Sequence, residues 1–478
     1  MTDGQPGTDG RAVTDDAPVT ATEGAEPAAG AEPADGAEPA DSNQSGDGAE
    51  PVAAATAAEP AVRRIRPLGV ALVAVVLLLA GGLPTALVFG LVRAGEPPAP
   101  RASAAPAEDP ATAAARRLGE RMTAELARQS AALLGGDRAG FLAVAEPVAH
   151  PDLRRRYAAL RALRVTAWEA YATGLPAPVE GRPGEWRLLV EFRYCFVTPG
   201  CRTSRVLTGT RWREGERPRL LAVEPSRSAG TGTRPWEVSE LAVAVGPRTL
   251  VATTPALRRD LPGLLAQAEA AARVADTYAV DGRTPDRYRI FQAGRGEWQR
   301  WYGGGRPKWT GGYAVTVGGG HHEVVLNAEG LVAGGVDDLL RHELTHAASL
   351  PEQGYPGKDT WWLVEGLAEY AGADGEPVDR YPGLDEVRSL FGGGWDGRLG
   401  SLSLADDAPA DRVGGSYGIS YLAVRHLVDR FGPERLLAFF AAVVHERTPV
   451  ERAAERVLGE PWPALHAGCV AYVRAVVG

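Results

Sequence analysis

Two stretches, Val336-Asp-Asp-Leu-Leu-Arg-His-Glu-Leu-Thr-His-Ala-Ala-Ser349 and Thr360-Trp-Trp-Leu-Val-Glu-Gly-Leu-Ala-Glu-Tyr370, decide how this chain folds. The first has apolar residues at helical spacing and places His342 and His346 four residues apart. In a helix this spacing puts both imidazoles on one face, about 6 Å apart along the axis. The first stretch is therefore predicted to be a helix that presents two histidines side by side.

Two imidazoles in this arrangement can both reach one tetrahedral zinc ion at about 2.0–2.1 Å. Glu343 is adjacent and can lie over a water molecule at the metal. The second stretch places Glu365 and Glu369 four residues apart, and 18 residues (347–364), rich in turn formers, separate it from His346. We expect Glu365 to be the third ligand, which leaves one position open for water. Glu369 is expected to contact a ligand histidine and fix its orientation.

The pattern His-Glu-x-x-His, an 18-residue spacer and then Trp-x-x-Glu-Gly-x-Ala-Glu-Tyr resembles the gluzincin metallopeptidases. These are the thermolysin-like and aminopeptidase-like branch of the zincins, and the arrangement is similar to peptidase-MA-like domains of many bacterial proteins. The resemblance implies peptide-bond hydrolysis with one zinc ion held by His342, His346 and Glu365. It also implies that Glu343 is the general base and that Glu369 supports a ligand histidine. The sequence lacks the Gly-x-Met-Glu-Asn segment that holds a free α-amine in aminopeptidases, so endopeptidase action is expected.

Such enzymes generally add a tyrosine or histidine that stabilises the oxyanion, and residues 414–426 supply candidates. We expect Ser416 to cap a helix, so that Tyr417 lies near its start and points toward the cleft. Tyr421 is the next candidate, and both tyrosines can equally be packing residues. His426 lies about 180° around the helix from Tyr417 and is expected to be structural.

Three further segments near the motif carry weaker signals. The Gly-flanked run Gly311–Val317 is either an ordinary strand or an exposed sheet edge that pairs with an extended peptide. His321 and His322 are expected on a loop or edge-strand surface, away from the metal. Residues 373–414 either gate the cleft or are disordered.

The expected fold class is α+β. Residues 236–478 read as a small mixed sheet followed by helices, a zincin-like domain. Residues 111–228 read as a separate α+β module, helical over 111–173 and stranded over 185–224. This module weakly resembles the nuclear-transport-factor-2-like fold. No catalytic constellation is visible in it, so a spacer or protein-binding role is favoured over a ligand pocket.

The first hundred residues predict where the protein resides. Residues 1–62 hold 13 acidic and one basic residue, lack aromatics and repeat Gly-Ala-Glu-Pro-Ala, which is typical of a disordered tail. Leu68–Val92 are 25 residues without a charge. As a helix they would span about 37 Å, against about 30 Å for a hydrocarbon core, so residues 63–93 are predicted to be a transmembrane helix. Residues 94–110 read as a Pro/Ala linker.

Arginines at positions 63, 64 and 66 flank the N-terminal side of this span. By the positive-inside rule the tail is cytoplasmic, and the rest of the chain lies outside the cell membrane. An oxidising exterior permits a disulfide between Cys195 and Cys201, which flank a turn sequence, whereas Cys469 is expected to be a buried free thiol. The formal charge of the whole chain is −9, and the part after Arg93 is close to neutral, so nucleic acid is not an expected partner. The expected partners are a peptide or protein substrate and the membrane.

Two other functions fit the same residues. One is a catalytically inactive zinc-binding protein whose 111–228 module binds a partner. The other is a cell-wall peptide hydrolase, which shares the metal chemistry and differs only in substrate. Glu343 favours a hydrolase, because a structural zinc site does not require a base.

Overall fold

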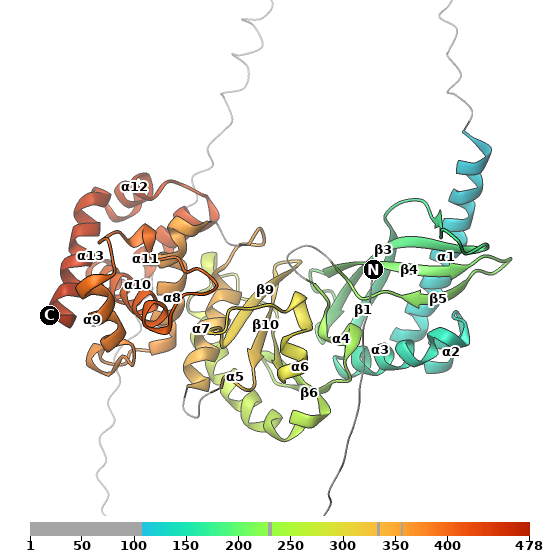
Figure 1. Ribbon diagram of the computed structural model, residues 1–478, viewed down its shortest axis with the longest axis horizontal. Helices are drawn as coiled ribbons and strands as arrows, with labels where there is room; N and C mark the ends of the chain where they lie inside the picture. The colour runs from blue at the N-terminus through green and yellow to red at the C-terminus, as the bar shows by residue number, and fades with distance from the viewer. Residues whose placement is uncertain (1–107, 228–231, 332–334, 355–356) are drawn as a thin grey trace, which may run out of the picture. The chain divides into compact units, whose positions relative to one another are not determined.

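The computed structural model describes residues 108–227, 232–331, 335–354 and 357–478 (Figure 1). The acidic tail 1–62, the segment 63–93 and most of the linker 94–110 lie outside the described residues, so the structures predicted for them stay predictions. Among the helices that are described, none has both the length and the apolar character needed to cross a bilayer.

The first part of the described chain packs three helices against an antiparallel sheet (Figure 1). Its first helix forms because Leu118, Met122, Leu126 and Leu133 recur at spacings of four or seven residues and are buried together on one face. The helices are α1 (Pro110–Leu134), α2 (Arg138–Ala143) and α3 (His150–Ala162), and the strands in sheet order are β1 (Val165–Ala172), β3 (Glu185–Phe196), β4 (Ser204–Arg213) and β5 (Arg219–Val223), with β2 (Ala177–Pro178) beside β3.

The prediction that residues 111–173 are helical is wrong for Val165–Ala172, which form β1. The helix before it stops because Arg164 adopts a φ of 53°, outside the helical region. Trp168 is then buried with its ring 5.0 Å from that of Phe192 on β3. Pairing with the long strand β3 therefore overrides the local helical spacing.

The second sheet is mixed (Figure 1). Its central strands β7, β8 and β10 run parallel, while β6 and β9 are antiparallel edge strands. One face packs against α5 and α7, and the other joins the core of the first part of the chain. In sheet order the strands are β6 (Ala242–Val245), β7 (Thr249–Thr253), β8 (Tyr288–Ala293), β10 (His321–Asn327) and β9 (Gly312–Gly318), and the helices in this region are α4 (Pro235–Val238), α5 (Leu261–Asp276), α6 (Arg295–Trp298) and α7 (Val336–Ser349).

The prediction that His321 and His322 lie on a surface is wrong, because each is 5% exposed. They occupy β10, an interior strand, and successive strand residues point to opposite faces. His321 contacts Ser204 through Nδ1 at 3.2 Å and Asp286 through Nε2 at 2.8 Å. His322 shares its face with Val324, which packs among the residues of α5 and α7.

The remainder of the chain is a cluster of helices (Figure 1). The helices Trp361–Ala373 and Ala410–Phe431 approach closely because Gly366 has no side chain. A Cβ there would lie 2.5 Å from the carbonyl oxygen of Ser420. The helices are α8 (Trp361–Ala373), α9 (Leu384–Gly393), α10 (Ala410–Phe431), α11 (Pro433–Phe440), α12 (Val450–Ala453) and α13 (Trp462–Val477).

One expectation for this region is corrected, and one of two alternatives is excluded. Helix α10 begins at Ala410, so Ser416 is a buried interior residue and not a cap, and Tyr417 lies two turns into the helix. Disorder of residues 373–414 is excluded, because this segment includes α9, which packs on α10 through the apolar residues Val387 and Leu390. Gating of the cleft by this segment stays a prediction.

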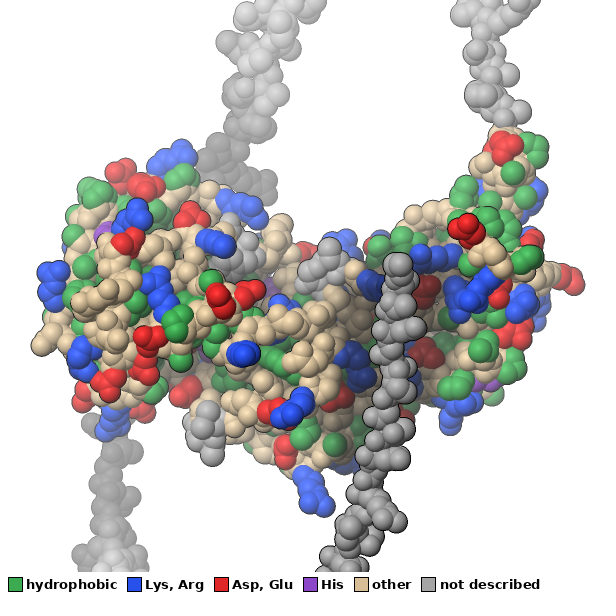
Figure 2. All heavy atoms as spheres, in the orientation of Figure 1, with side chains coloured by type: hydrophobic (Ala, Val, Ile, Leu, Met, Phe, Trp, Pro, Cys, Tyr) green, Lys and Arg blue, Asp and Glu red, His purple; other side chains and the backbone are tan. Residues whose placement is uncertain are grey.

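Charged side chains of both signs are intermixed on the face shown in Figure 2. Several form close pairs, such as Arg193 with Glu191 at 2.7 Å and Arg430 with Glu460 at 2.6 Å. The numerous arginines of this chain are thus partly neutralised by neighbouring carboxylates.

Candidate metal centre

Helix α7 brings the two motif histidines together. Their Nε2 atoms lie 3.0 Å apart, and the side chains are almost completely buried. Leu340 and Leu344 on the opposite side of the helix are buried against the sheet, which fixes the rotation of the helix about its axis. His342 and His346 therefore face away from the sheet, toward α8.

Helix α8 supplies the third group of the site. Glu365 Oε2 lies 3.1 Å from His346 Nε2 and 3.3 Å from His342 Nε2. Three ligand atoms of a tetrahedral zinc ion lie about 3.3 Å from one another, so this triangle has the size and the donor atoms that zinc requires. Burial would raise the pKa of Glu365, but His346 and His342 outweigh it and lower that pKa to about 2. The carboxylate is thus ionised and able to bind a cation.

A second carboxylate, one turn further along α8, holds the back of the first histidine. Glu369 Oε1 lies 3.0 Å from His342 Nδ1. Burial lowers the pKa of His342, but Glu365 and Glu369 outweigh it and raise that pKa well above its usual value. With Nδ1 engaged by Glu369, the Nε2 atom is left directed at the triangle, as an imidazole that binds a metal requires.

Tyr381 extends this chain of contacts, and no feature of the sequence singled it out. Its hydroxyl donates a hydrogen bond to Glu369 Oε2 at 2.8 Å. Burial and the neighbouring Glu369 raise the pKa of Tyr381 well above its usual value, so the phenol keeps the proton that it donates. The residue lies just after a short 3₁₀ turn in the 373–414 segment, and a pattern based on helical spacing has no means of finding it.

Glu343 lies beside the edge strand β9. Gly312 makes room for it, since a Cβ at that position would lie 2.9 Å from Glu343 Oε1. Among the described residues Glu343 Oε2 has no hydrogen-bond partner, although it is buried. Burial raises the pKa of this carboxyl above its usual value, against the opposing effect of His342 and His346. A carboxylate in this environment is suited to accept a proton near neutral pH.

Tyr417 is the tyrosine of α10 that lies against the metal triangle. Its ring centroid is 6.0 Å from that of His342 and 5.0 Å from that of Trp361. Tyr421, one turn later, is fully buried, stacks on Tyr381 with 4.4 Å between ring centroids and accepts a hydrogen bond from Arg425. Of the two candidates, Tyr417 has the placement from which a hydroxyl can serve a reacting group beside the histidines.

These residues open onto a cleft of about 810 Å³. One wall comes from β9 and the segment before it, a second from α7 and α8, and a third from the 373–414 segment and α10. Residues from these walls include Trp309, Gly312, His342, Glu369, Tyr381 and Tyr417.

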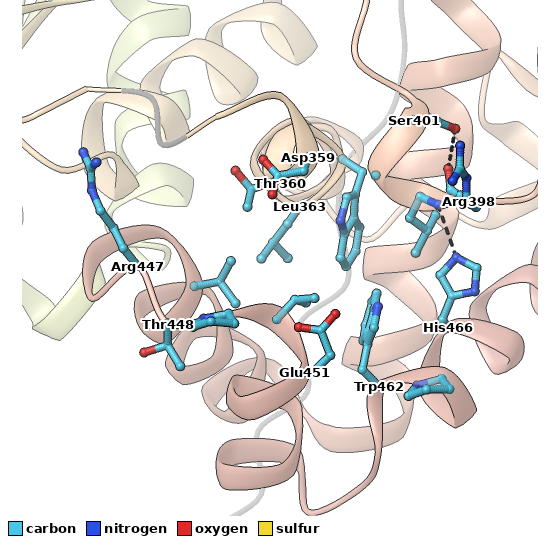
Figure 3. A pocket seen from close by; sticks show the side chains of 17 residues that line it. Asp359, Thr360, Leu363, Arg398, Ser401, Arg447, Thr448, Glu451, Trp462 and His466 are labelled. Atoms are coloured by element: carbon cyan, nitrogen blue, oxygen red, sulfur yellow. Dashed lines mark hydrogen bonds between the residues drawn. The ribbon is translucent and has the colours of Figure 1, made fainter.

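A second hollow of similar size, about 790 Å³, lies among α8, α12 and α13 (Figure 3). Figure 3 shows Asp359 and Thr360 on one side and Glu451 with Trp462 on the other. Trp462 stacks on Trp362 with 5.5 Å between ring centroids. Among the described residues, the acidic side chains that line this second hollow do not belong to any group of metal-ligand atoms.

The described residues contain one other group with metal-ligand atoms, formed by Cys201, Asp286 and His321. Cys201 is bonded to Cys195 in a disulfide, so its sulfur is not available as a thiolate ligand. Cys469 is a buried free thiol, as the sequence predicts.

No protein-family model and no curated protein matches the chain. Among solved structures, it is similar to an M1 zinc metallopeptidase from Deinococcus radiodurans, with a TM-score of 0.28 and 18% identity over 65% of this chain and 61% of that one. It is also similar to native yeast LTA4 hydrolase, with a TM-score of 0.34 and 14% identity over 64% of this chain and 43% of that one. The chain thus spans less than two thirds of these proteins. Structural similarities with TM-scores this low support no inference about activity. Any such inference rests on the residues of the site.

Proposed function

We propose that this chain is a zinc-dependent peptidase. The observation that carries the proposal is the triangle of His342 Nε2, His346 Nε2 and Glu365 Oε2, with sides of 3.0 to 3.3 Å. His342 and Glu343 also line the cleft. Two imidazoles and one carboxylate are one of the ligand sets of catalytic zinc, and three protein ligands leave a position for water.

Zinc bound there would supply Lewis-acid polarisation of the scissile carbonyl and lower the pKa of a water molecule. Glu343 takes a proton from the water molecule as the oxygen of that water attacks the carbonyl carbon. It then delivers this proton to the amine nitrogen as the carbon–nitrogen bond breaks. Tyr417 donates a hydrogen bond to the carbonyl oxygen as negative charge develops on it.

The substrate is proposed to be an extended peptide that adds to the sheet at β9. This strand is an edge strand, and its first residue, Gly312, lies against Glu343. Main-chain hydrogen bonds from an edge strand hold a peptide regardless of its sequence. Endopeptidase action is favoured because the chain lacks a Gly-x-Met-Glu-Asn segment to capture a free amine.

We also propose that residues 63–93 anchor the protein in the cell membrane, with the described residues on the outside. The support is the 25-residue uncharged run and the arginines before it. Sodium carbonate extraction of membranes should leave the full chain in the pellet, and external protease should degrade the part after Arg93 in intact cells. Release into the carbonate supernatant would contradict the anchor.

The catalytic proposal is tested by zinc analysis together with cleavage of a peptide library, in the presence and absence of a chelator. Glu343→Gln is expected to retain zinc and to lose about 10²- to 10⁴-fold in kcat/KM. Glu451→Gln, an exposed acid in the second hollow, is the matched control and should behave as the wild type. Normal cleavage by Glu343→Gln, or cleavage that a chelator does not affect, would overturn the proposal.

A further inference from the structure

We infer that the first part of the chain contributes a substrate subsite, a groove between β4 and the end of β9 that receives the peptide about four to six residues before the scissile bond. This inference rests on the proposed function and goes beyond it by assigning a selective role to the 111–228 module. The occupant is a peptide segment that carries an acidic side chain.

The groove has a volume of about 410 Å³ and is built from two distant parts of the sequence. Thr316, Val317 and Gly318 come from β9, whereas Arg205 and Leu207 come from β4. Further lining residues are Glu191, Arg234, Glu352, Gln353 and Gly354. The same edge strand therefore begins at the metal centre and ends in this groove.

The direction of β9 determines which part of a substrate would lie there. Gly312 is the end of the strand beside Glu343, and Gly318 is the far end. A peptide that pairs antiparallel with β9 runs from Gly318 toward Gly312, so its residues over Thr316–Gly318 precede the scissile bond. At about 3.4 Å per residue, the four to six positions between Gly312 and Thr316–Gly318 correspond to about 14–20 Å of extended peptide.

The groove is held in place by buried contacts between the two sheets. Ser204, directly before Arg205, is fully buried, accepts a hydrogen bond from Arg289 at 2.8 Å and contacts His321 at 3.2 Å. Arg289 and His321 belong to strands β8 and β10. The start of β4 is thereby attached to the catalytic sheet, and the position of Arg205 relative to β9 is fixed.

The charges of the groove favour an acidic ligand. Glu191 is paired with Arg193 at 2.7 Å, and Glu352 with Arg202 at 3.1 Å. Among the described residues Arg205 has no hydrogen bond or ion pair, although its Cγ packs close to Gly318. The acidic groups are thus already neutralised while one guanidinium is available, and a carboxylate is the group that pairs with it best.

Leu207 adds an apolar surface beside this guanidinium. It points the same way as Arg205 along β4 and is 38% exposed. In an extended peptide, side chains two residues apart point to the same side. An acidic residue and an apolar residue at this spacing, in either order, would contact Arg205 and Leu207. The proposed ligand is therefore a short extended segment with this alternation.

The test uses the full chain with the Glu343→Gln substitution, zinc-loaded, and fluorescein-labelled peptides built on the best-cleaved library sequence. In one series, each position from four to six residues before the cut carries Glu, Gln or Lys in turn. One further peptide begins two residues before the cut and therefore lacks all of these positions. Fluorescence anisotropy gives the Kd, and kcat/KM is measured in parallel with an unsubstituted Glu343. Arg205→Gln is compared with Arg213→Gln, an exposed arginine at the other end of β4.

Truncation is expected to weaken binding about tenfold. Glu should be favoured over Lys by about threefold to fivefold, as for an exposed ion pair. Arg205→Gln should abolish this preference, and Arg213→Gln should retain it. Equal Kd values for the long and truncated peptides, or the same behaviour of both arginine variants, would overturn the subsite while leaving the peptidase proposal intact. Absence of chelator-sensitive cleavage of every peptide would overturn the proposed function and this inference with it.

Discussion

Two pairs of histidines are buried in this molecule, one on a helix and one on a strand. His342 and His346 are four residues apart on α7, and their Nε2 atoms are 3.0 Å from each other. His321 and His322 are adjacent on β10, where alternation directs them to opposite faces of the sheet. Both pairs are buried, but only the four-residue spacing on the helix makes the two rings converge.

The surroundings of the two pairs differ in charge as well as in geometry. Glu365 and Glu369 face the helical pair and raise the pKa of His342 well above its usual value, against the effect of burial. On the strand, burial, aided by the nearby histidines, lowers the pKa of His322 to about 4. Metal binding requires that the rings and a carboxylate converge on one point. His321 has Asp286 beside it at 2.8 Å, but the rings of the strand pair point to opposite faces of the sheet and do not converge.

The largest expected effect follows from removing one ring of the converging pair. His346→Ala should reduce the zinc content from about one ion per chain to almost none and abolish hydrolysis, because only two ligand atoms remain. His322→Gln, which alters a buried histidine outside the triangle, is the matched control and should keep its zinc. Inductively coupled plasma mass spectrometry after dialysis measures the content, and circular dichroism checks that both variants are folded. A stoichiometric, tightly held zinc in His346→Ala would show that the triangle is not the metal site.

The next effect concerns the tyrosine that packs against the converging pair. Tyr417→Phe should lower kcat by about 10²- to 10³-fold, the range for loss of one oxyanion donor, with the zinc content unchanged. Tyr421→Phe should cost much less, because that hydroxyl already accepts a hydrogen bond from Arg425 and its ring stacks on Tyr381. Steady-state kinetics on one peptide distinguishes the two. If the two variants are equally active, Tyr417 serves only in packing.

A third effect separates the pairs by their response to acid. The folded protein holds the pKa of His322 near 4, below the usual 6.5, so the unfolded chain binds more protons between these values. The contribution of His322 to the free energy of unfolding is therefore fully present above about pH 6.5. It is lost as the pH falls toward 4, and its full size is about 3 kcal/mol.

The measurement for this third effect is guanidinium unfolding of chelator-treated protein at pH 7 and pH 4.5, so that loss of metal does not contribute. The loss of stability in the wild type should exceed that in His322→Gln, in which the ionisable ring is replaced. An equal loss in both proteins would mean that His322 titrates normally in the folded state.

Local sequence patterns account for the parts of the structure that depend on spacing along one element. The helices α7 and α8 follow from apolar periodicity, and the four-residue spacing is enough to place the paired side chains of each on one face. Features set by packing between elements were not predictable in this way. Val165–Ala172 form a strand because β3 is available as a partner, and the burial of His321 depends on Asp286, which is 35 residues away.

The same distinction explains what was missed within the candidate site. The helix α10 extends seven residues further toward its N-terminus than a cap at Ser416 would allow, because its first turns pack on α9: a Cβ at Gly415 would lie 2.6 Å from Leu390 Cβ. Tyr381 reaches Glu369 from a segment whose path is set by this packing. Single-sequence patterns carry no information on such contacts.

The smallest expected effect concerns Glu369, the carboxylate that contacts the ring of His342 on the side away from the ligand triangle. Glu369→Gln should weaken zinc binding by about 10- to 100-fold, the usual range for a residue that orients a ligand histidine. The amide can still contact His342 Nδ1, now 3.0 Å from Glu369 Oε1, but without the negative charge that increases the basicity of the ring. Tyr381→Phe should weaken zinc binding less, because it removes only the hydrogen bond to Glu369 Oε2.

Competition with a chromogenic chelator at fixed pH gives the zinc Kd for this last comparison. The expected order is wild type, Tyr381→Phe and then Glu369→Gln, from the tightest to the weakest binding. A tyrosine variant that binds zinc more weakly than the glutamine variant would mean that Tyr381 acts on the metal centre by a route other than Glu369. Wild-type affinity in Glu369→Gln would mean that packing of α7 against the sheet alone orients the ring of His342. The spacing of the helical pair, together with Glu365, would then be enough to bind zinc.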